Sequence, residues 1–258
     1  MVKTIEGSRA APRTPSVDAD EVAKFSAMAA DWWNPTGKFK PLHRFNPIRL
    51  KFIRDTAEAH FGIPAGQSRP LAGLRLLDIG CGGGLVCEPM TRLGARVTGV
   101  DASEANIKTA LTHAREQGLE IDYRAGTAEG LIDSGEPSFD IVLNLEVVEH
   151  VADAHQFLID TASLVRPGGL MIVASLNRTA KALATAVIGA EYILGWLPRG
   201  THDWSKFVTP EEVRTALHAA GMQPEPAIGV SYKSLSGSWV LSNDTAVNFM
   251  VVSRRPAT

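Results

Sequence analysis

Cysteine is scarce in this sequence of 258 residues, and Cys81 and Cys87 are the only two. Their spacing matches no zinc framework, and two cysteines cannot support a disulfide-rich fold. The sequence therefore indicates a reducing compartment, in which both residues serve as small buried side chains.

The sequence also lacks an excess of charge of either sign. Its 26 Lys and Arg residues nearly balance its 28 Asp and Glu residues, and the net charge is -2. Nucleic-acid-binding proteins usually carry a basic excess, so we expect no nucleic-acid partner. Residues 1–17 contain no apolar core of a secretory signal. We predict a cytoplasmic protein in which residues 1–17 form a disordered tail.

Apolar residues make up 45% of the chain, enough for one large domain, which we place at residues 18–258. Residues 18–70 are expected to form a helical cap. One helix is capped by Asp18, and a second begins with Asn46 as its cap and Pro47 in its first turn and ends at Gly62. Beyond the cap, short apolar runs alternate with helical patterns. This alternation predicts a parallel sheet covered on both faces, followed by two last strands near residues 227–232 and 246–253.

The segment LLDIGCGGGLVCEPM joins a buried strand to a helix through a glycine-rich turn. Gly80, Gly82 and Gly84 leave the backbone bare, which allows a ligand to approach it. Asp101 ends the next strand 21 residues after Gly80, where a carboxylate can accept hydrogen bonds from both hydroxyls of an adenosine ribose. Asp78, just before the turn, is placed to orient the turn or to meet a cationic ligand.

Two missing motifs narrow the choice of ligand. No G-K-[ST] follows the glycines, so a P-loop is not expected. None of the three tyrosines is followed four positions later by a lysine, which argues against a short-chain nicotinamide-dependent dehydrogenase.

With Asp101, the block LLDIGCGGG resembles motif I and its acidic partner in class I S-adenosylmethionine-dependent methyltransferases. Four further blocks carry a more specific resemblance: KFSAMAADWWNPTGKFKPLHRFNPIRLKFI, LNLEVVEHV, LNRTAKA and GAEYILGWLPRGTHDWSKF. Together they resemble the ubiquinone biosynthesis O-methyltransferase family, from Asp18 to about Arg254. The resemblance implies an α/β, Rossmann-like fold with a seven-stranded, mostly parallel sheet and helices on both faces. An insertion at residues 177–208 is expected after strand 5.

The resemblance also implies an activity, which is O-methylation of phenolic hydroxyls by S-adenosyl-L-methionine. The acceptors would be polyprenylated catechol or demethylubiquinol intermediates of ubiquinone biosynthesis. A small-molecule methyltransferase of another pathway and a non-catalytic cofactor-binding module are the alternatives. The family's positions and the glycine turn together predict these cofactor-binding residues: Arg49, Asp78, Gly80, Gly82, Gly84, Asp101 and Leu145. Leu145 departs from the methionine common in the family, but either side chain can cover an adenine face.

The segment LEVVEHV follows the fourth strand, beside the expected position of the transferred methyl group. Glu146, Glu149 and His150 stand at i, i+3 and i+4, on one face of a helical turn. They could bind a divalent cation that chelates a catechol and lowers its pKa. Alternatively, Glu149 orients His150, which takes the phenolic proton. In a third interpretation Glu146 caps the turn and His150 makes an ordinary hydrogen bond.

The resemblance favours the metal among these three interpretations, because the family is associated with magnesium at these positions. Histidine is an unusual magnesium ligand, so manganese or zinc is an alternative.

The apolar stretch from Lys181 to Pro198 is interrupted by Glu191 and is too short to span a bilayer. It fits a membrane-surface helix, a helix packed on the sheet, or a dimer contact. The first interpretation suits a polyprenylated substrate and predicts peripheral binding to anionic lipid on the inner face of the cytoplasmic membrane. Other enzymes of ubiquinone biosynthesis are the protein partners that the resemblance suggests.

Overall fold

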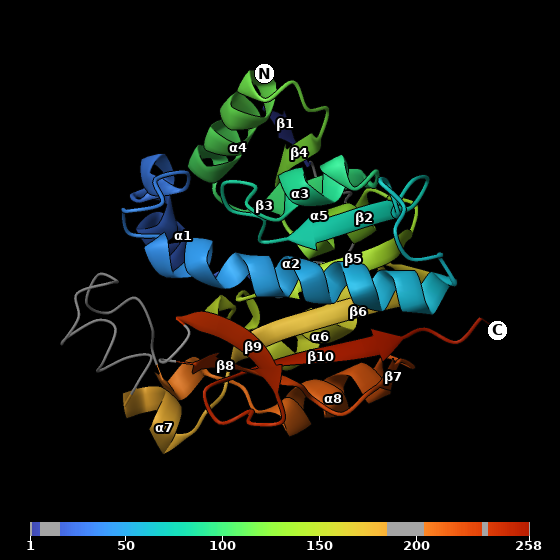
Figure 1. Ribbon diagram of the computed structural model, residues 1–258. Helices are drawn as coiled ribbons and strands as arrows, with labels where there is room; N and C mark the ends of the chain where they lie inside the picture. The colour runs from blue at the N-terminus through green and yellow to red at the C-terminus, as the bar shows by residue number, and fades with distance from the viewer. Residues whose placement is uncertain (1, 6–15, 185–203, 234–236, 258) are drawn as a thin grey trace.

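The computed structural model describes residues 2–5, 16–184, 204–233 and 237–257. Within them, one eight-stranded sheet runs in the order β1-β4-β3-β2-β5-β6-β10-β7, and β8 pairs with β9 in a second sheet (Figure 1). The strands are β1 (Lys3–Thr4), β2 (Arg75–Ile79), β3 (Arg96–Asp101), β4 (Asp122–Ala125), β5 (Phe139–Leu145), β6 (Val165–Leu176), β7 (Gln223–Pro224), β8 (Gly229–Lys233), β9 (Ser238–Ser242) and β10 (Asn248–Arg254).

The main sheet is parallel from β4 through β3, β2 and β5 to β6, as the alternation of strands and helices predicted. β10, which overlaps the last strand predicted near residues 246–253, runs antiparallel to β6. Because β2, β3 and β5 are parallel, their carboxyl ends meet at one edge of the sheet. Ligands of open α/β sheets bind at this edge.

Helices cover both faces of the sheet (Figure 1). Buried side chains of α2, α3 and α4 pack on one face, and those of α5, α6 and α8 pack on the other. The helices are α1 (Ala19–Ser26), α2 (Lys40–Phe61), α3 (Cys87–Arg92), α4 (Glu104–Glu116), α5 (Ala128–Asp133), α6 (Ala154–Ser163), α7 (Ala180–Ala182) and α8 (Pro210–Ala219). Short 3₁₀ turns in the described part of the chain are η1 (Ala29–Asp31), η2 (Val148–His150) and η4 (Trp204–Lys206).

The N-terminal cap has its own apolar cluster, which ties it to the glycine turn. Met28, Trp32 and Phe39 of the cap are buried together with Leu85 of the turn. Asp18 caps α1 as predicted, since its carboxylate accepts from the backbone N–H groups of Asp20 and Glu21. The N-terminal cap is therefore packed directly against the glycine turn.

The long helix α2 begins earlier than predicted. It starts at Lys40 with Pro41 in its first turn, so Pro47 lies inside the helix. Both prolines fit the rule that places proline in a first turn, and the local pattern did not separate them. Asn46 does not cap the helix, because its side chain donates to the Leu85 carbonyl at 2.9 Å. The end was predicted correctly: Gly62 terminates α2 in the left-handed conformation, with φ +64°.

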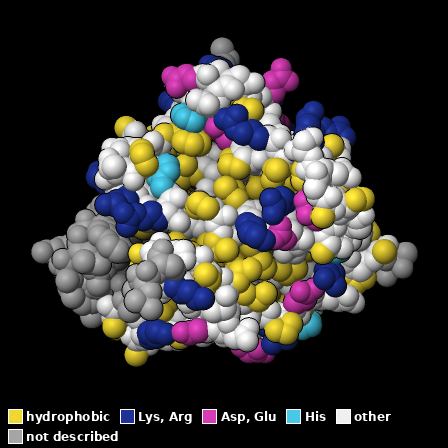
Figure 2. Space-filling model, in the orientation of Figure 1, with side chains coloured by type: hydrophobic (Ala, Val, Ile, Leu, Met, Phe, Trp, Pro, Cys, Tyr) yellow, Lys and Arg dark blue, Asp and Glu magenta, His cyan; other side chains and the backbone are white. Residues whose placement is uncertain are grey.

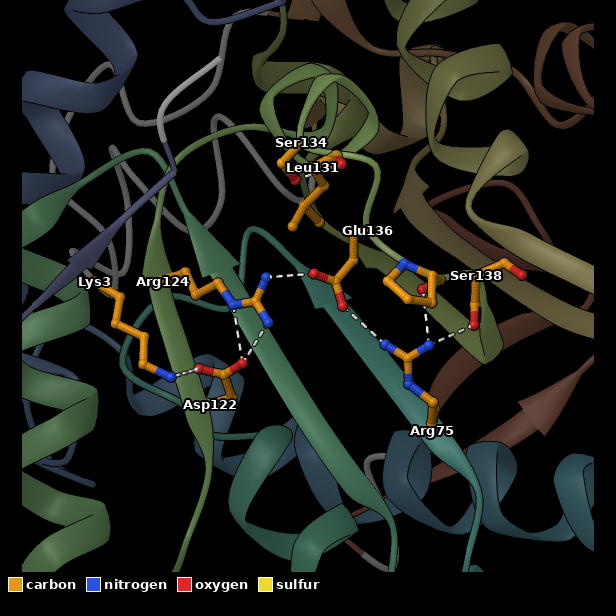
Figure 3. Close-up of polar contacts among 9 residues, drawn as sticks. Lys3, Arg75, Asp122, Arg124, Leu131, Ser134, Glu136 and Ser138 are labelled. Carbon is orange, nitrogen blue, oxygen red and sulfur yellow. Dashed lines mark hydrogen bonds and ion pairs between the residues drawn. The ribbon is translucent and has the colours of Figure 1, made fainter. Parts of the chain in front are cut away.

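The N-terminal strand β1 was not predicted. Lys3 and Thr4 pair in parallel with β4, whereas we expected a disordered tail over residues 1–17. The Lys3 ammonium lies 2.7 Å from the Asp122 carboxylate, in a chain of ion pairs that continues through Arg124 to Glu136 (Figure 3). Residues 6–15 of the predicted tail lie outside the described residues.

The predicted insertion at residues 177–208 is described only in part. Residues 185–203, which hold most of the apolar stretch considered for membrane binding, lie outside the described residues. No helix in the described part of the chain is long and apolar enough to cross a membrane.

Candidate active site

The glycine turn after β2 is shaped by the protein's own side chains. Gly80, Gly82 and Gly84 all have positive φ, between 53° and 89°. A Cβ added at Gly80 would stand 2.3 Å from a methyl group of Val147, and one at Gly82 would stand 2.4 Å from the ring of Trp32. The sequence suggested that a ligand needs the bare backbone. The structure adds an internal reason, which is close packing against this turn.

A cavity of about 540 Å³ opens beside the turn, a volume typical of small-molecule sites. The cap, α2, the ends of β2, β3 and β5, and the β8–β9 hairpin all contribute to its wall. Seven of the predicted site residues line it: Arg49, Asp78, Gly80, Asp101, Leu145, Glu146 and His150. Gly82, Gly84 and Glu149 lie outside its wall.

Asp101 ends β3 and is held by three donors. Its Oδ2 accepts from the Gly82 N–H at 2.9 Å, and its Oδ1 accepts from the Ser103 N–H at 2.8 Å and from the Asn106 amide at 3.2 Å. Burial raises the pKa of Asp101, although the three hydrogen bonds oppose this shift. The carboxylate is thus fixed in one orientation on the cavity wall.

Asp78 of β2 and Arg49 of α2 both line this cavity. Burial raises the pKa of Asp78 to about 7, and the Cys87 thiol, which donates to it at 3.3 Å, opposes the shift together with the charge of Arg49. Asn46 accepts from the guanidinium of Arg49 through Nε at 3.2 Å and Nη2 at 3.0 Å. Nη1 of Arg49 is buried without a hydrogen-bond partner. A guanidinium with an open donor suits a carboxylate ligand.

The three residues of EVVEH do not share one helical face. Glu146 has φ +57°, so the helical turn starts only after it, at η2. Its carboxylate lies 3.8 Å from Nη1 of Arg49. Glu149 is buried and accepts from the Ser175 hydroxyl at 3.0 Å. Burial, followed by the charge of Glu146, holds the pKa of Glu149 well above its usual range.

In the structure, the carboxylate that contacts the His150 ring belongs to Glu21 and not to Glu149. Nδ1 of His150 lies 2.9 Å from Oε2 of Glu21, which is on α1 of the cap. The Phe25 ring meets the imidazole edge to face at 5.0 Å. One of the three interpretations of the sequence paired His150 with Glu149. None of them included Glu21, which lies 129 positions from His150 in the chain.

The donor set does not fit a metal ion in this arrangement. Among the described residues, no group of three His, Cys, Asp or Glu side chains could hold one. Glu146 and Glu149 do approach each other, and this contact helps to raise the pKa of Glu149. Each predicted ligand also has a further partner, which is Arg49 for Glu146, Ser175 for Glu149 and Glu21 for His150.

Another part of the cavity wall is aromatic. Phe45 of α2 meets Trp239 of β9 edge to face at 5.3 Å between ring centroids, and Tyr232 of β8 lies 5.2 Å from Trp239. Figure 2 shows hydrophobic side chains gathered in the middle of the face that α2 crosses in Figure 1. Of the two strands in this hairpin, only β8 was predicted from the sequence. β9 pairs with β8 outside the main sheet, so its sequence lacks the apolar pattern of a buried strand.

Known proteins of similar sequence are methyltransferases. Residues 77–173 match a family model described as a methyltransferase domain. The chain is 63% identical to the ubiquinone biosynthesis O-methyltransferase of Maricaulis maris, over 97% of this chain and 99% of that protein. It is 60% identical to the enzyme of the same name from Parvibaculum lavamentivorans, over 93% of this chain and 94% of that protein.

Solved structures resemble the fold at low sequence identity. Magnesium protoporphyrin IX methyltransferase from Synechocystis, solved with bound SAH, superposes with a TM-score of 0.65 at 19% identity, over 92% of this chain and all of that one. The plantazolicin methyltransferase BpumL, in complex with SAH, gives a TM-score of 0.63 at 14% identity, over 92% of this chain and 98% of that one. These likenesses support the class I methyltransferase fold.

Proposed function

Because the chain belongs to the ubiquinone biosynthesis O-methyltransferase family, we propose that its cavity binds S-adenosyl-L-methionine beside a phenolic acceptor and methylates the phenolic oxygen. The acceptor would be a polyprenylated catechol or demethylubiquinol. Contact with an anionic membrane and with other enzymes of ubiquinone biosynthesis remains a prediction.

One observation carries the proposal: three polar groups that complement the cofactor line a single cavity. Asp101 suits the two ribose hydroxyls as a hydrogen-bond acceptor. Nη1 of Arg49, which makes no hydrogen bond within the protein and lies 3.8 Å from Glu146, suits the carboxylate of the methionine part, and Asp78 suits its ammonium group. Leu145, buried at the end of β5, supplies an apolar surface for the adenine.

Methyl transfer needs alignment and removal of one proton. When bound, the cofactor supplies a sulfonium methyl group that a nucleophilic oxygen can take. A phenol near pKa 10 is a weak nucleophile, so a base that accepts its proton assists the transfer. His150 lies on the cavity wall, and Glu21 holds its Nδ1. In our proposal Nε2 accepts the phenolic proton, and the Glu21 carboxylate stabilises the imidazolium that forms.

In our proposal the phenolic acceptor binds against the aromatic part of the cavity wall. Phe45, Tyr232 and Trp239 present ring faces and edges to the cavity, and such rings suit a phenolic head group. Among the described residues no three His, Cys, Asp or Glu side chains form a group that could hold a divalent cation, so the proposed transfer relies on His150 and Glu21.

A methyl-transfer assay tests the proposal directly. The probe is S-adenosyl-L-methionine with an isotopically labelled methyl group, offered with a short-tail catechol. We expect labelled product from the wild type and at least about tenfold weaker cofactor binding by Asp101→Ala, because charge-assisted hydrogen bonds are lost. Asp122→Asn is the matched control, since Asp122 stands on the neighbouring strand and binds Lys3. Cofactor binding without transfer would instead indicate a non-catalytic module.

A further inference from the structure

Asn106 connects the cofactor carboxylate to the N-terminal cap. It lies on α4 and is 2% exposed. Its amide nitrogen donates to Oδ1 of Asp101 at 3.2 Å, and its amide oxygen accepts from the indole Nε1 of Trp32 at 2.9 Å. Both polar ends of one buried side chain are therefore engaged, one by the site and one by the cap.

The chemistry of the two neighbours allows only this orientation of the amide. An indole N–H can only donate, so it requires the oxygen of Asn106. A carboxylate can only accept, so it requires the nitrogen. If the indole donor were absent, only the Asp101 carboxylate would hold the amide, and Asn106 would be free to move away from its present position. The Trp32 N–H thus reinforces the orientation in which Asn106 donates to Asp101.

Trp32 is itself fixed by packing. Its ring stacks on Phe39 at 3.8 Å between centroids, with 7° between the planes. The same ring lies on the glycine turn, where an added Cβ at Gly82 or Gly83 would come within 2.4 Å of it. Gly82 in turn donates its N–H to Oδ2 of Asp101. One indole therefore supports both oxygens of the carboxylate, through Asn106 and through the turn.

We propose that Trp32 and Asn106 are positioning residues for recognition of the cofactor ribose, acting through Asp101. This inference rests on the proposed function, because it assumes that Asp101 binds the ribose hydroxyls of an S-adenosyl ligand. It gives the tryptophan of the cap a role in cofactor selectivity in addition to its role in packing.

The test compares two ligands on each variant: S-adenosylhomocysteine and its 2′-deoxyribose analogue, with dissociation constants measured by titration calorimetry. The wild type should prefer the ribose ligand. In Trp32→Phe, which keeps a ring but loses the donor, and in Asn106→Leu, which keeps the size but loses the amide, this preference should fall by about fivefold. The control Trp204→Phe removes an exposed indole N–H that donates to the Thr179 carbonyl, and its preference should equal that of the wild type.

The ratio of two affinities on one preparation does not depend on how much of the protein is folded, so a destabilised variant still gives an answer. An unchanged ratio in both Trp32→Phe and Asn106→Leu would overturn the inference, even if both ligands bound more weakly. If the wild type bound neither ligand, the proposed function itself would fail, and this outcome is distinct from an unchanged ratio.

Discussion

Glu21 and His150 are joined by a contact of 2.9 Å between Oε2 and Nδ1, across 129 positions of sequence. Lys24 also contacts the Glu21 carboxylate at 3.0 Å, and Lys206 approaches it at 3.8 Å. Burial raises the pKa of Glu21, but the hydrogen bonds and charges of His150 and Lys24 outweigh burial and lower it to about 2. A helix of the cap thereby places an ionised carboxylate on a histidine of the cavity wall.

Removing this carboxylate should slow turnover more than it weakens binding. We expect Glu21→Gln to lower kcat by about tenfold to a hundredfold and to leave the affinity for S-adenosyl-L-methionine nearly unchanged, because a general base loses its orienting partner. Steady-state kinetics and cofactor titration on the same preparation measure both. Asp20→Asn changes a neighbouring acidic residue on the exposed side of α1 and is the matched control. An equal loss in both quantities would indicate a structural role for Glu21.

The contribution of Glu21 to the free energy of unfolding should depend on pH. Its pKa falls from 4.5 in the unfolded chain to about 2 in the folded protein, so the ionised form favours folding. This contribution is present above about pH 4.5 and is lost as the pH falls toward 2. We expect the wild type to be more stable than Glu21→Gln at neutral pH, with a gap that narrows below about pH 4.5. Denaturant unfolding at a series of pH values measures the gap, and a gap that widens in acid would contradict the assignment.

Asp78 should make cofactor binding sensitive to pH near neutrality. Its pKa of about 7 in the free protein means that many molecules carry a protonated Asp78 below that pH. A cationic ligand favours the ionised form, so its affinity should rise as the pH increases from about 6 to about 7.5. Titration calorimetry in two buffers with different ionisation enthalpies should also detect proton release on binding. In Asp78→Asn both effects should disappear, and their persistence would point to another group.

The raised pKa of Asp78 also makes the folding stability depend on pH, but stability falls as the pH rises, whereas cofactor affinity increases. A carboxyl group whose pKa is raised in the folded state favours folding below its unfolded pKa of 3.8, and this contribution is lost as the pH rises through about 7. Asp78→Asn removes the penalty of a buried charge. At about pH 8 it should therefore be at least as stable as the wild type while binding the cofactor more weakly, and thermal unfolding checks the first part.

Alanine at Gly82 should be far more costly than alanine at Gly118. Both glycines have positive φ, +53° and +66°, for which a non-glycine residue costs about 1–2 kcal/mol. A Cβ at Gly82 would also stand 2.4 Å from Trp32, whereas no atom lies within 4 Å of one at Gly118. Overpacking adds about 1–3 kcal/mol at Gly82 alone. Denaturant unfolding of the two variants measures the difference, and equal losses would show that Trp32 yields without cost.

Local patterns in the sequence determined the main secondary-structure elements of this protein and their order. The alternation of apolar runs with helical segments predicted the parallel sheet, and Asp18 and Gly62 marked a helix start and a helix end, because capping depends on residues a few positions apart. The spacing from Gly80 to Asp101 brought turn and carboxylate together at the edges of paired strands. The family blocks then identified the chemistry.

Tertiary packing alone decided the partners within the site. Asn46 satisfied the local rule for a cap, yet the burial of α2 against the glycine turn gives its side chain to Leu85 and Arg49. Glu146, Glu149 and His150 matched a helical spacing, but Glu146 has a positive φ and lies before the helical turn, and His150 contacts Glu21. Glu21 reaches His150, and Trp32 reaches Asn106, because the cap folds back over the sheet. Such contacts follow from the shape of buried surfaces that are distant in sequence, and no short-range periodicity encodes them.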